Sequence, residues 1–270
     1  MDSQSPLKLP VIDFTKPELK PGTHEWDLAK GQVQQALQHY GCFEALFDKI
    51  PLEIREAVFG VMEELFYLPL QIKSRNVSEI PYHGYIGQHP TIPLFERIGF
   101  DDADVIEKVE AQTRTFWPQG NPSSRRMILE SFQVEKYVDE HMDSTGYLLK
   151  VMKYEGPKTS GTQVGLSAHT NQDVVTILYQ NEVNGLEAWL NGRLKATYHR
   201  VMMSGDKPMD SLGLFSVPKA GYMIKAPEEL VDEAHPLLYN PFDYAQFLGF
   251  YFSNGGRYQS GLKAYCGVQH

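Results

Sequence analysis

The sequence predicts an α+β fold, in which a helical N-terminal portion precedes a β-rich core of the jelly-roll type. Two observations support this class. Apolar residues recur at helical spacing in the first half of the chain, whereas after about residue 147 the chain consists of short β-type runs separated by Gly, Pro, Asn and Asp. Several short strands at this spacing are typical of a sandwich or barrel rather than of a parallel α/β sheet.

The N-terminal region, residues 1–120, is expected to hold one strand and two helices. Residues 9–14 form a short apolar run closed by an acid, which predicts an initial strand. Apolar residues at helical spacing predict helices over 26–39 and 52–65, the second ending before Pro69 because proline disfavours helix at the preceding residue. Turn-rich loops are predicted at 81–85 and 116–122.

The second region, residues 121–270, is expected to contain the β core. A third helix is predicted over 127–142, and residues 242–248 followed by 263–267 are expected to form a closing helix and tail. Strands are predicted over residues 147–152, 174–179, 198–203 and 212–217.

Composition excludes several functional classes. A net charge of −9 and a pI near 5.5 argue against a nucleic-acid or anionic-membrane partner, because neither surface attracts an acidic protein that has no basic patch. No stretch approaches the length of a membrane span, and the first residues do not resemble a signal peptide. We expect a cytoplasmic monomer that acts on a small molecule. Cys42 and Cys266 lack metal-type spacing and are expected to be packed thiols.

Three short motifs indicate the function. They are Gly-Leu-Ser-Ala-His-Thr-Asn at 165–171, Tyr-His-Arg at 198–200 and Asp-Ser-Leu-Gly-Leu-Phe-Ser at 210–216. Together they resemble the active-site strands of plant Fe(II)/2-oxoglutarate-dependent dioxygenases. The resemblance runs from residue 9 to residue 267, and residues 40–48, 81–85 and 198–205 are most similar to the subgroup that includes glucosinolate side-chain-modifying and auxin-oxidising enzymes. It implies a double-stranded β-helix as the core.

The resemblance also implies the site and its cofactors. His169 and His199 would bind Fe(II), with residue 171 as the third metal ligand, and Tyr154 and Ser211 would hold the cosubstrate 2-oxoglutarate. Ascorbate is expected as an auxiliary reductant. Two histidines and one carboxylate leave the remaining iron positions open for a 2-oxo acid and O₂. Residue 171 should lie beside His169, because two positions along a strand return to the same face.

The third ligand position departs from the family pattern, because Asn171 stands where the family has Asp. An amide oxygen is neutral, so it compensates the charge of the ferrous ion less well than a carboxylate does. Iron affinity should therefore fall. Asp173 is an alternative ligand, but it lies roughly 6.6 Å further along an extended strand and would need a local bulge to replace residue 171.

The cosubstrate position departs as well, because Met209 stands where the family has the Arg that holds the far carboxylate of 2-oxoglutarate. A guanidinium makes two parallel charge-assisted hydrogen bonds to a carboxylate, and a thioether makes none. Lys207 is the nearest cation in the sequence, although a solvated turn lysine is the simpler interpretation. Ser211 remains as a hydroxyl donor.

The chain is also shorter than the family pattern. His169 and His199 are only thirty positions apart, and Glu187 runs directly into Ala188 where the family has additional strands. A second, smaller gap is expected near residues 122–126. A jelly roll that lacks strands exposes unpaired edges and opens its core. A skipped exon, an erroneous gene model and a decayed gene copy would all produce this pattern.

We therefore predict a 2-oxoglutarate/Fe(II)-dependent oxygenase that hydroxylates, desaturates or dealkylates a small plant metabolite and releases succinate and CO₂. The alternative is a catalytically impaired or inactive relic, or a splice form, that acts at most as a binding protein. A zinc hydrolase that uses the two histidines is a more remote alternative, because the chain has neither a suitably placed Glu base nor a His-Glu-x-x-His helix.

Overall fold

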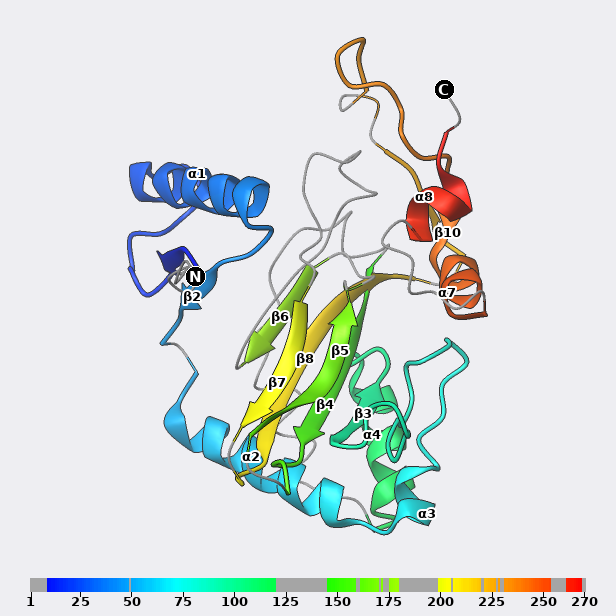
Figure 1. Ribbon diagram of the computed structural model, residues 1–270. Coiled ribbons are helices and arrows are strands. Elements are labelled where there is room, and N and C mark those ends of the chain that lie inside the picture. Colours follow the sequence, from blue (N-terminus) through cyan, green and yellow to red (C-terminus); the bar gives the residue numbers. More distant parts are fainter. Residues whose placement is uncertain are drawn as a thin grey trace.

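A central antiparallel sheet of four strands, in the order β3-β4-β8-β6, organises the molecule (Figure 1). The computed structural model describes residues 9–48, 50–119, 145–158, 161–169, 171, 175–179, 199–204, 206–219, 221–226, 228, 231–253 and 261–268. The strands of this sheet are β3 (Phe95–Phe100), β4 (Thr145–Tyr154), β8 (Met209–Pro218) and β6 (Val175–Tyr179). A second antiparallel pair, β5 (Thr162–His169) and β7 (His199–Ser204), faces it.

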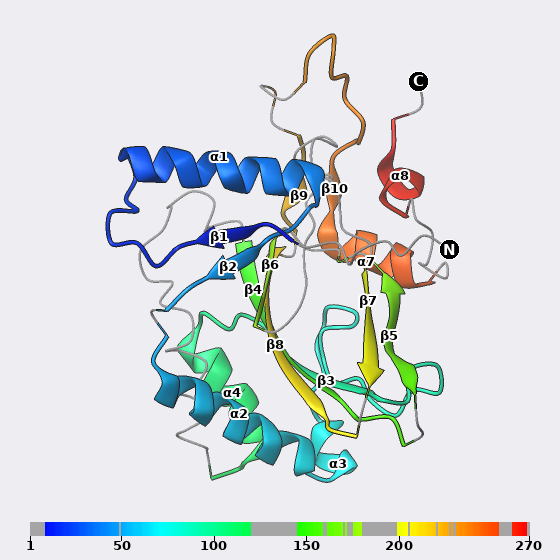
Figure 2. The same cartoon turned by 60° about the vertical axis from the view of Figure 1, so that its left-hand side comes forward.

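The N-terminal strand and the first helix are confirmed. β1 (Val11–Asp13) pairs in parallel with β2 (Glu44–Leu46), and α1 (His24–His39) connects them. The helix begins at Thr23, whose hydroxyl oxygen accepts a hydrogen bond from the backbone N–H of Trp26 at 3.2 Å and so satisfies one free donor of the first turn. In both ribbon views this unit lies beyond one end of the central sheet (Figures 1 and 2).

Two helices cover the outer face of the central sheet. They are α2 (Leu52–Tyr67), which was predicted, and α4 (Ile106–Phe116), which was not. α2 ends at Leu68, whose extended backbone is the conformation that a following proline favours. The short helix α3 (Leu70–Lys73) follows at once and was also missed. Figure 2 shows α2 and α4 on one side of β8 and the β5–β7 pair on the other.

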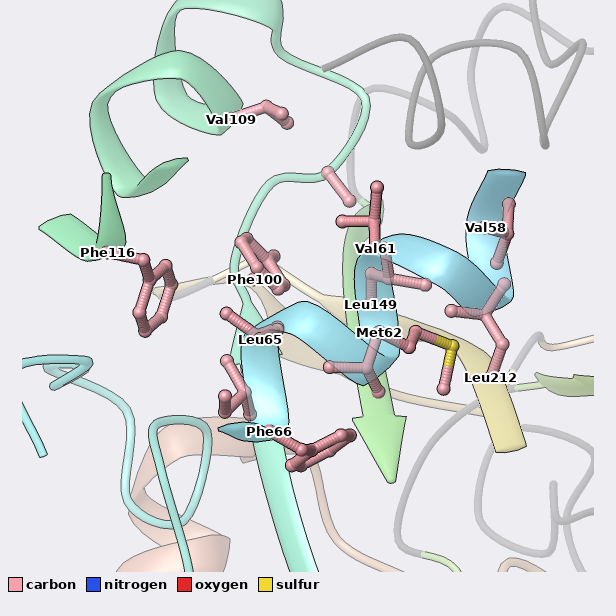
Figure 3. Packing of buried hydrophobic residues seen from close by; sticks show 13 residues of the cluster. Val58, Val61, Met62, Leu65, Phe66, Phe100, Val109, Phe116, Leu149 and Leu212 are labelled. Atoms are coloured by element: carbon pink, nitrogen blue, oxygen red, sulfur yellow. The ribbon is translucent and has the colours of Figure 1, made fainter. Parts of the chain in front are cut away.

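The alternation of side chains divides the central sheet into two faces. On the outer face, Phe100, Leu149 and Leu212 pack against Met62 and Leu65 of α2 (Figure 3). On the inner face, the ring of Tyr154 and the side chain of Met152 form a cluster with Met203 of β7. Gly165 of β5 approaches this cluster so closely that a Cβ atom there would lie 3.0 Å from the ring of Tyr154. The inner face of the sheet therefore packs against the β5–β7 pair at Tyr154 and Met152.

β3 was not predicted, although it belongs to the central sheet. Its sequence contains Glu96, Arg97 and Gly99, which weaken the period-two pattern of a strand. It pairs antiparallel with β4, from Phe95 opposite Tyr154 to Phe100 opposite Leu149. The N-terminal and C-terminal regions of the chain thus share one sheet.

The C-terminal segment closes one end of the inner face. β9 (Met223–Ile224) pairs with β10 (Phe242–Asp243), followed by α7 (Tyr244–Ser253) and α8 (Gly261–Cys266). The prediction of a helix from residue 242 is corrected, since residues 242–243 form a strand and the helix begins at Tyr244. Both cysteines are buried, as expected for packed thiols. No helix in the described ranges is long and apolar enough to cross a membrane, and the helix predicted over 127–142 lies outside those ranges.

Candidate metal and cosubstrate site

The structure brings the two motif histidines together. His169 is the last residue of β5 and His199 is the first residue of β7, and the pairing of these strands places them directly opposite each other. Their ring centroids lie 4.3 Å apart, with an angle of 51° between the ring planes. Two imidazoles at this separation can approach one metal ion.

Hydrogen bonding and burial favour a neutral His169 ring with an available Nε2. Its Nδ1 lies 2.8 Å from the backbone oxygen of Ser167, so Nδ1 carries the proton and Nε2 keeps its lone pair. Burial lowers the pKa of His169 to about 4, and the nearby His199, Lys150 and Arg97 act in the same direction. A neutral imidazole with a free Nε2 is the form that binds metals.

Asn171 does not share a strand with His169, and that expectation is corrected. β5 ends at His169, and Asn171 lies beyond it as a half-buried residue. Its Nδ2 donates a hydrogen bond to the hydroxyl oxygen of Thr176 on β6 at 2.9 Å. Asparagine side chains commonly bond to groups a few residues away in this manner and so favour turns over strands. The bond uses the amide nitrogen, which leaves the carbonyl oxygen as the candidate metal ligand.

The donor set fits a ferrous ion incompletely. Two imidazoles and an amide oxygen are ligand types that iron accepts, but the set has no negative charge. Across the residues that the structure describes, no group of three or more His, Cys, Asp and Glu side chains could hold a metal ion. Asp173, the alternative third ligand, lies outside the described residues.

Tyr154 and Ser211 lie on the inner face of the central sheet. Tyr154 ends β4 and is opposite Met209, and Ser211 is opposite Met152. Both side chains are almost fully buried, and burial raises the pKa of Tyr154 above its ordinary value, so its hydroxyl remains a hydrogen-bond donor. Met209 is half-buried and packs against the same cluster. Lys207 is exposed and lies before the start of β8.

Two cations on the same face were missed by the sequence analysis. Arg97 of β3 is opposite Met152, and Lys150 of β4 is opposite Gly213 of β8. Both influence His169 electrostatically, which places them near the histidine pair. The side-chain alternation of β3 would have indicated Arg97, but only if β3 had been recognised as a strand.

Comparisons with known proteins identify the family of this chain. Residues 9–118 match the family model described as the N-terminal region of the non-haem dioxygenase in morphine synthesis. The chain is 43% identical over 312 residues to the probable 2-oxoglutarate-dependent dioxygenase AOP1.2 of Arabidopsis thaliana, with 96% of each chain covered. Because that alignment is longer than the 270 residues of this chain, the relative contains segments without a counterpart here. The expected gaps at Glu187–Ala188 and near 122–126 fall outside the described residues.

Solved structures show the same fold. A dioxygenase for auxin oxidation from rice matches with a TM-score of 0.76 and 22% identity, covering 97% of this chain and all of the other. The 2-oxoglutarate complex of the dioxygenase for auxin oxidation 1 from Arabidopsis thaliana matches with a TM-score of 0.69 and 18% identity, covering 84% of this chain and 99% of the other. With a curated relative at 43% identity across nearly its whole length, this chain belongs to the plant family of 2-oxoglutarate-dependent dioxygenases.

Proposed function

We propose that this chain binds Fe(II) and 2-oxoglutarate in the space between the central sheet and the β5–β7 pair, and oxidises a small plant metabolite there. The observation that carries the proposal is the histidine pair, with centroids 4.3 Å apart and with Nε2 of His169 available to a metal. The core is proposed to be a double-stranded β-helix that lacks some of its strands. The reaction would convert 2-oxoglutarate and O₂ to succinate and CO₂, with ascorbate as auxiliary reductant.

Three residues would hold the metal. Nε2 of His169, an imidazole nitrogen of His199 and the amide oxygen of Asn171 would be the protein ligands, and the iron would supply open coordination positions for the 2-oxo acid and O₂. The 2.8 Å bond from Nδ1 of His169 to Ser167 fixes the orientation of the first ring. The bond from Asn171 to Thr176 anchors the amide to β6.

The inner face of the central sheet would hold the cosubstrate. The hydroxyls of Tyr154 and Ser211 are buried, and hydrogen bonds in such an environment are stronger than in water because the local dielectric constant is low. Both hydroxyls would donate to 2-oxoglutarate. The cluster of Phe95, Met152 and Met203 around Tyr154 would exclude water from that end of the site.

A binding protein without catalytic activity is the second candidate. Asn171 and Met209 favour it, because the first leaves the metal site without an anionic ligand and the second leaves the cosubstrate site without the family's cation. Substrates for a test can be chosen from the relatives, since the rice neighbour is described as a dioxygenase for auxin oxidation. Auxin is therefore the first compound to try.

Succinate formation distinguishes the two candidates. Purified chain is incubated with Fe(II), ascorbate, 2-oxoglutarate and a panel of plant metabolites that includes auxin, and succinate is measured. An oxygenase forms succinate above the level of His199→Ala, whereas His39→Ala, which removes an exposed histidine of α1, leaves the rate unchanged. Equal succinate from the unsubstituted chain and His199→Ala would support the binding protein instead.

A further inference from the structure

Arg97 is a buried arginine whose hydrogen bonds are incomplete. Only 8% of the residue is exposed. One guanidinium nitrogen, Nη2, donates to the backbone oxygen of Tyr82, while Nε has no hydrogen-bond partner within the described part of the chain. Buried polar groups without partners are rare in folded proteins, and each one calls for an explanation.

Within the described ranges, no residue compensates the charge of Arg97. Among the described residues, no carboxylate forms an ion pair with it, and the groups that act on it electrostatically are the hydroxyls of Tyr154 and Tyr244. Burial lowers its pKa to about 10, so the guanidinium stays charged at neutral pH. Lys150 adds a second cation to the same face, with Nζ 3.9 Å from the ring centre of Phe215. Buried charges are normally paired, so the buried guanidinium of Arg97 favours an anion beside it.

Strand pairing places Arg97 in line with the cosubstrate residues. Arg97 is opposite Met152 on β4, and Met152 is opposite Ser211 on β8. Since neighbouring strands are about 4.8 Å apart, Arg97 and Ser211 are roughly 10 Å apart across β4, with their side chains on one face. Tyr154 lies on that face two positions from Met152. The guanidinium and the two hydroxyls therefore point into one region.

We propose that Arg97 binds a carboxylate of a ligand in this region and supplies the cation that position 209 lacks. Its guanidinium offers the fork of donors that a carboxylate requires, and the free Nε is one of those donors. The inference rests on the proposed function, because the ligand is either the cosubstrate or the substrate of that reaction. A carboxylate can come from the far end of 2-oxoglutarate or from an acidic substrate.

The position of Arg97 favours 2-oxoglutarate, rather than an acidic substrate, as the source of this carboxylate. Ser211 and Tyr154, the two hydroxyls assigned to the cosubstrate, border the same region, and Arg97 acts electrostatically on both Tyr154 and His169. A 2-oxo acid bound beside the histidine pair would thus extend toward the guanidinium. Arg97 would reach the far carboxylate from β3, whereas an arginine at position 209 would reach it from β8.

Two matched 2-oxo acids test the role of Arg97. 2-Oxoglutarate and 2-oxopentanoate have the same chain length, but only the first carries a far carboxylate. Their dissociation constants are measured calorimetrically, without oxygen and with excess Fe(II), for the unsubstituted full chain, Arg97→Gln, Arg97→Lys and Arg75→Gln. Phenylacetate, a monocarboxylate without a 2-oxo group, is titrated into the same four proteins.

The expected result is a loss of selectivity. The unsubstituted chain should prefer 2-oxoglutarate, and Arg97→Gln should weaken 2-oxoglutarate binding by about tenfold to a hundredfold while 2-oxopentanoate binds as before. Arg97→Lys keeps the positive charge but loses the paired donors of the guanidinium, so it should retain part of the preference for 2-oxoglutarate. It replaces Arg97→Gln in the test if that variant does not fold. Arg75→Gln removes an exposed arginine and should change nothing.

The other outcomes distinguish a carboxylate of the cosubstrate from one of the substrate, and failure of this inference from failure of the proposed function. Weaker phenylacetate binding in Arg97→Gln with an unchanged 2-oxo acid preference would assign the carboxylate to the substrate. Equal weakening of all three ligands, or no change in any, would overturn the inference and leave Arg97 a structural role. If the unsubstituted chain bound neither 2-oxo acid, the proposed function would fail, and an unchanged phenylacetate affinity would then overturn the inference as well.

Discussion

Single side chains determine how far the metal site departs from the family pattern. His169 is fixed by its bond to Ser167 and opposes His199, so two of the proposed ligands are well positioned. Asn171, the proposed third ligand, would offer a neutral oxygen in place of an anionic one, and its amide nitrogen bonds to Thr176. The charge of the third ligand, rather than the placement of the histidines, should therefore limit iron affinity.

Asn171→Asp should strengthen iron binding. A carboxylate restores negative charge to the ligand set, and changes of even an outer-shell partner typically alter metal affinity by about tenfold to a hundredfold, so the gain should be at least of that order. Anaerobic calorimetric titration with Fe(II) measures it, with the exposed Gln38→Glu of α1 as the control for added charge. Equal iron affinities for the unsubstituted chain and the Asn171→Asp variant would show that residue 171 is not at the metal.

His83 should make the protein less stable at mildly acidic pH. It is buried, and although its Nδ1 lies 2.7 Å from Asp101, burial and the nearby cations Lys150 and Arg97 lower its pKa. The unfolded chain therefore binds a proton more readily than the folded chain. The contribution of His83 is fully present above the unfolded pKa of about 6.5 and is lost as the pH falls below it.

Urea unfolding at pH 7.5 and at pH 5.5 measures this effect. The free energy of unfolding should fall between the two values in the unsubstituted chain, and His83→Gln should reduce the fall. His39→Gln, which replaces an exposed histidine of α1, should leave it unchanged. A fall of the same size in the His83→Gln protein would contradict the assignment.

Strand β3 links the N-terminal region to the central sheet and carries Arg97. The side-chain amide of Asn76 holds it at Gly99, donating to the Gly99 oxygen at 2.9 Å and accepting from its N–H at 3.3 Å. A Cβ atom at Gly99 would lie 1.8 Å from the backbone oxygen of His83. The loop before β3 can pack against the strand only because residue 99 has no side chain.

Gly99→Ala should destabilise the fold, whereas Gly146→Ala should be tolerated. Overpacking costs typically about 1–3 kcal/mol, and more is expected here because the obstructing atom belongs to the backbone. At Gly146 of β4 the nearest atom to an added Cβ is 3.5 Å away, which is ordinary contact. Urea denaturation midpoints of the two variants give the comparison, and equal midpoints would show that the loop moves aside freely.

The elements that sequence reasoning predicted are those with strong periodicity or a family motif. α1, α2, β4 and β8 have regular apolar patterns, and the histidines were located by motif. β3 was missed because Glu96, Arg97 and Gly99 obscure its alternation. α4 was missed because it is only 11 residues long and buries only Val109, Thr113 and Phe116, which is a weak apolar pattern. Arg97 could not be linked to the site without β3, since its role depends on pairing with β4.

We expect the missing segments to limit activity more than any single ligand does. The alignment to the Arabidopsis thaliana relative covers 312 residues against 270 in this chain, and our prediction from the motifs is that the larger loss lies between Glu187 and Ala188. Catalysis requires iron, cosubstrate and substrate in fixed mutual geometry, and a displacement of about 1 Å can cost around a hundredfold in rate. Substitutions at residues 171 and 209 would not restore the segments on which that geometry depends.

Asn171→Asp combined with Met209→Arg should therefore form succinate far more slowly than the Arabidopsis thaliana relative, with Fe(II), ascorbate and 2-oxoglutarate present. A chimera that receives the relative's segment between Glu187 and Ala188, together with both substitutions, should be faster than the double variant, because added strands pair open edges and narrow the site. Succinate formation by the unsubstituted chain at the relative's rate would contradict this ranking. It would mean that the shortened core still holds iron and cosubstrate in the reactive arrangement.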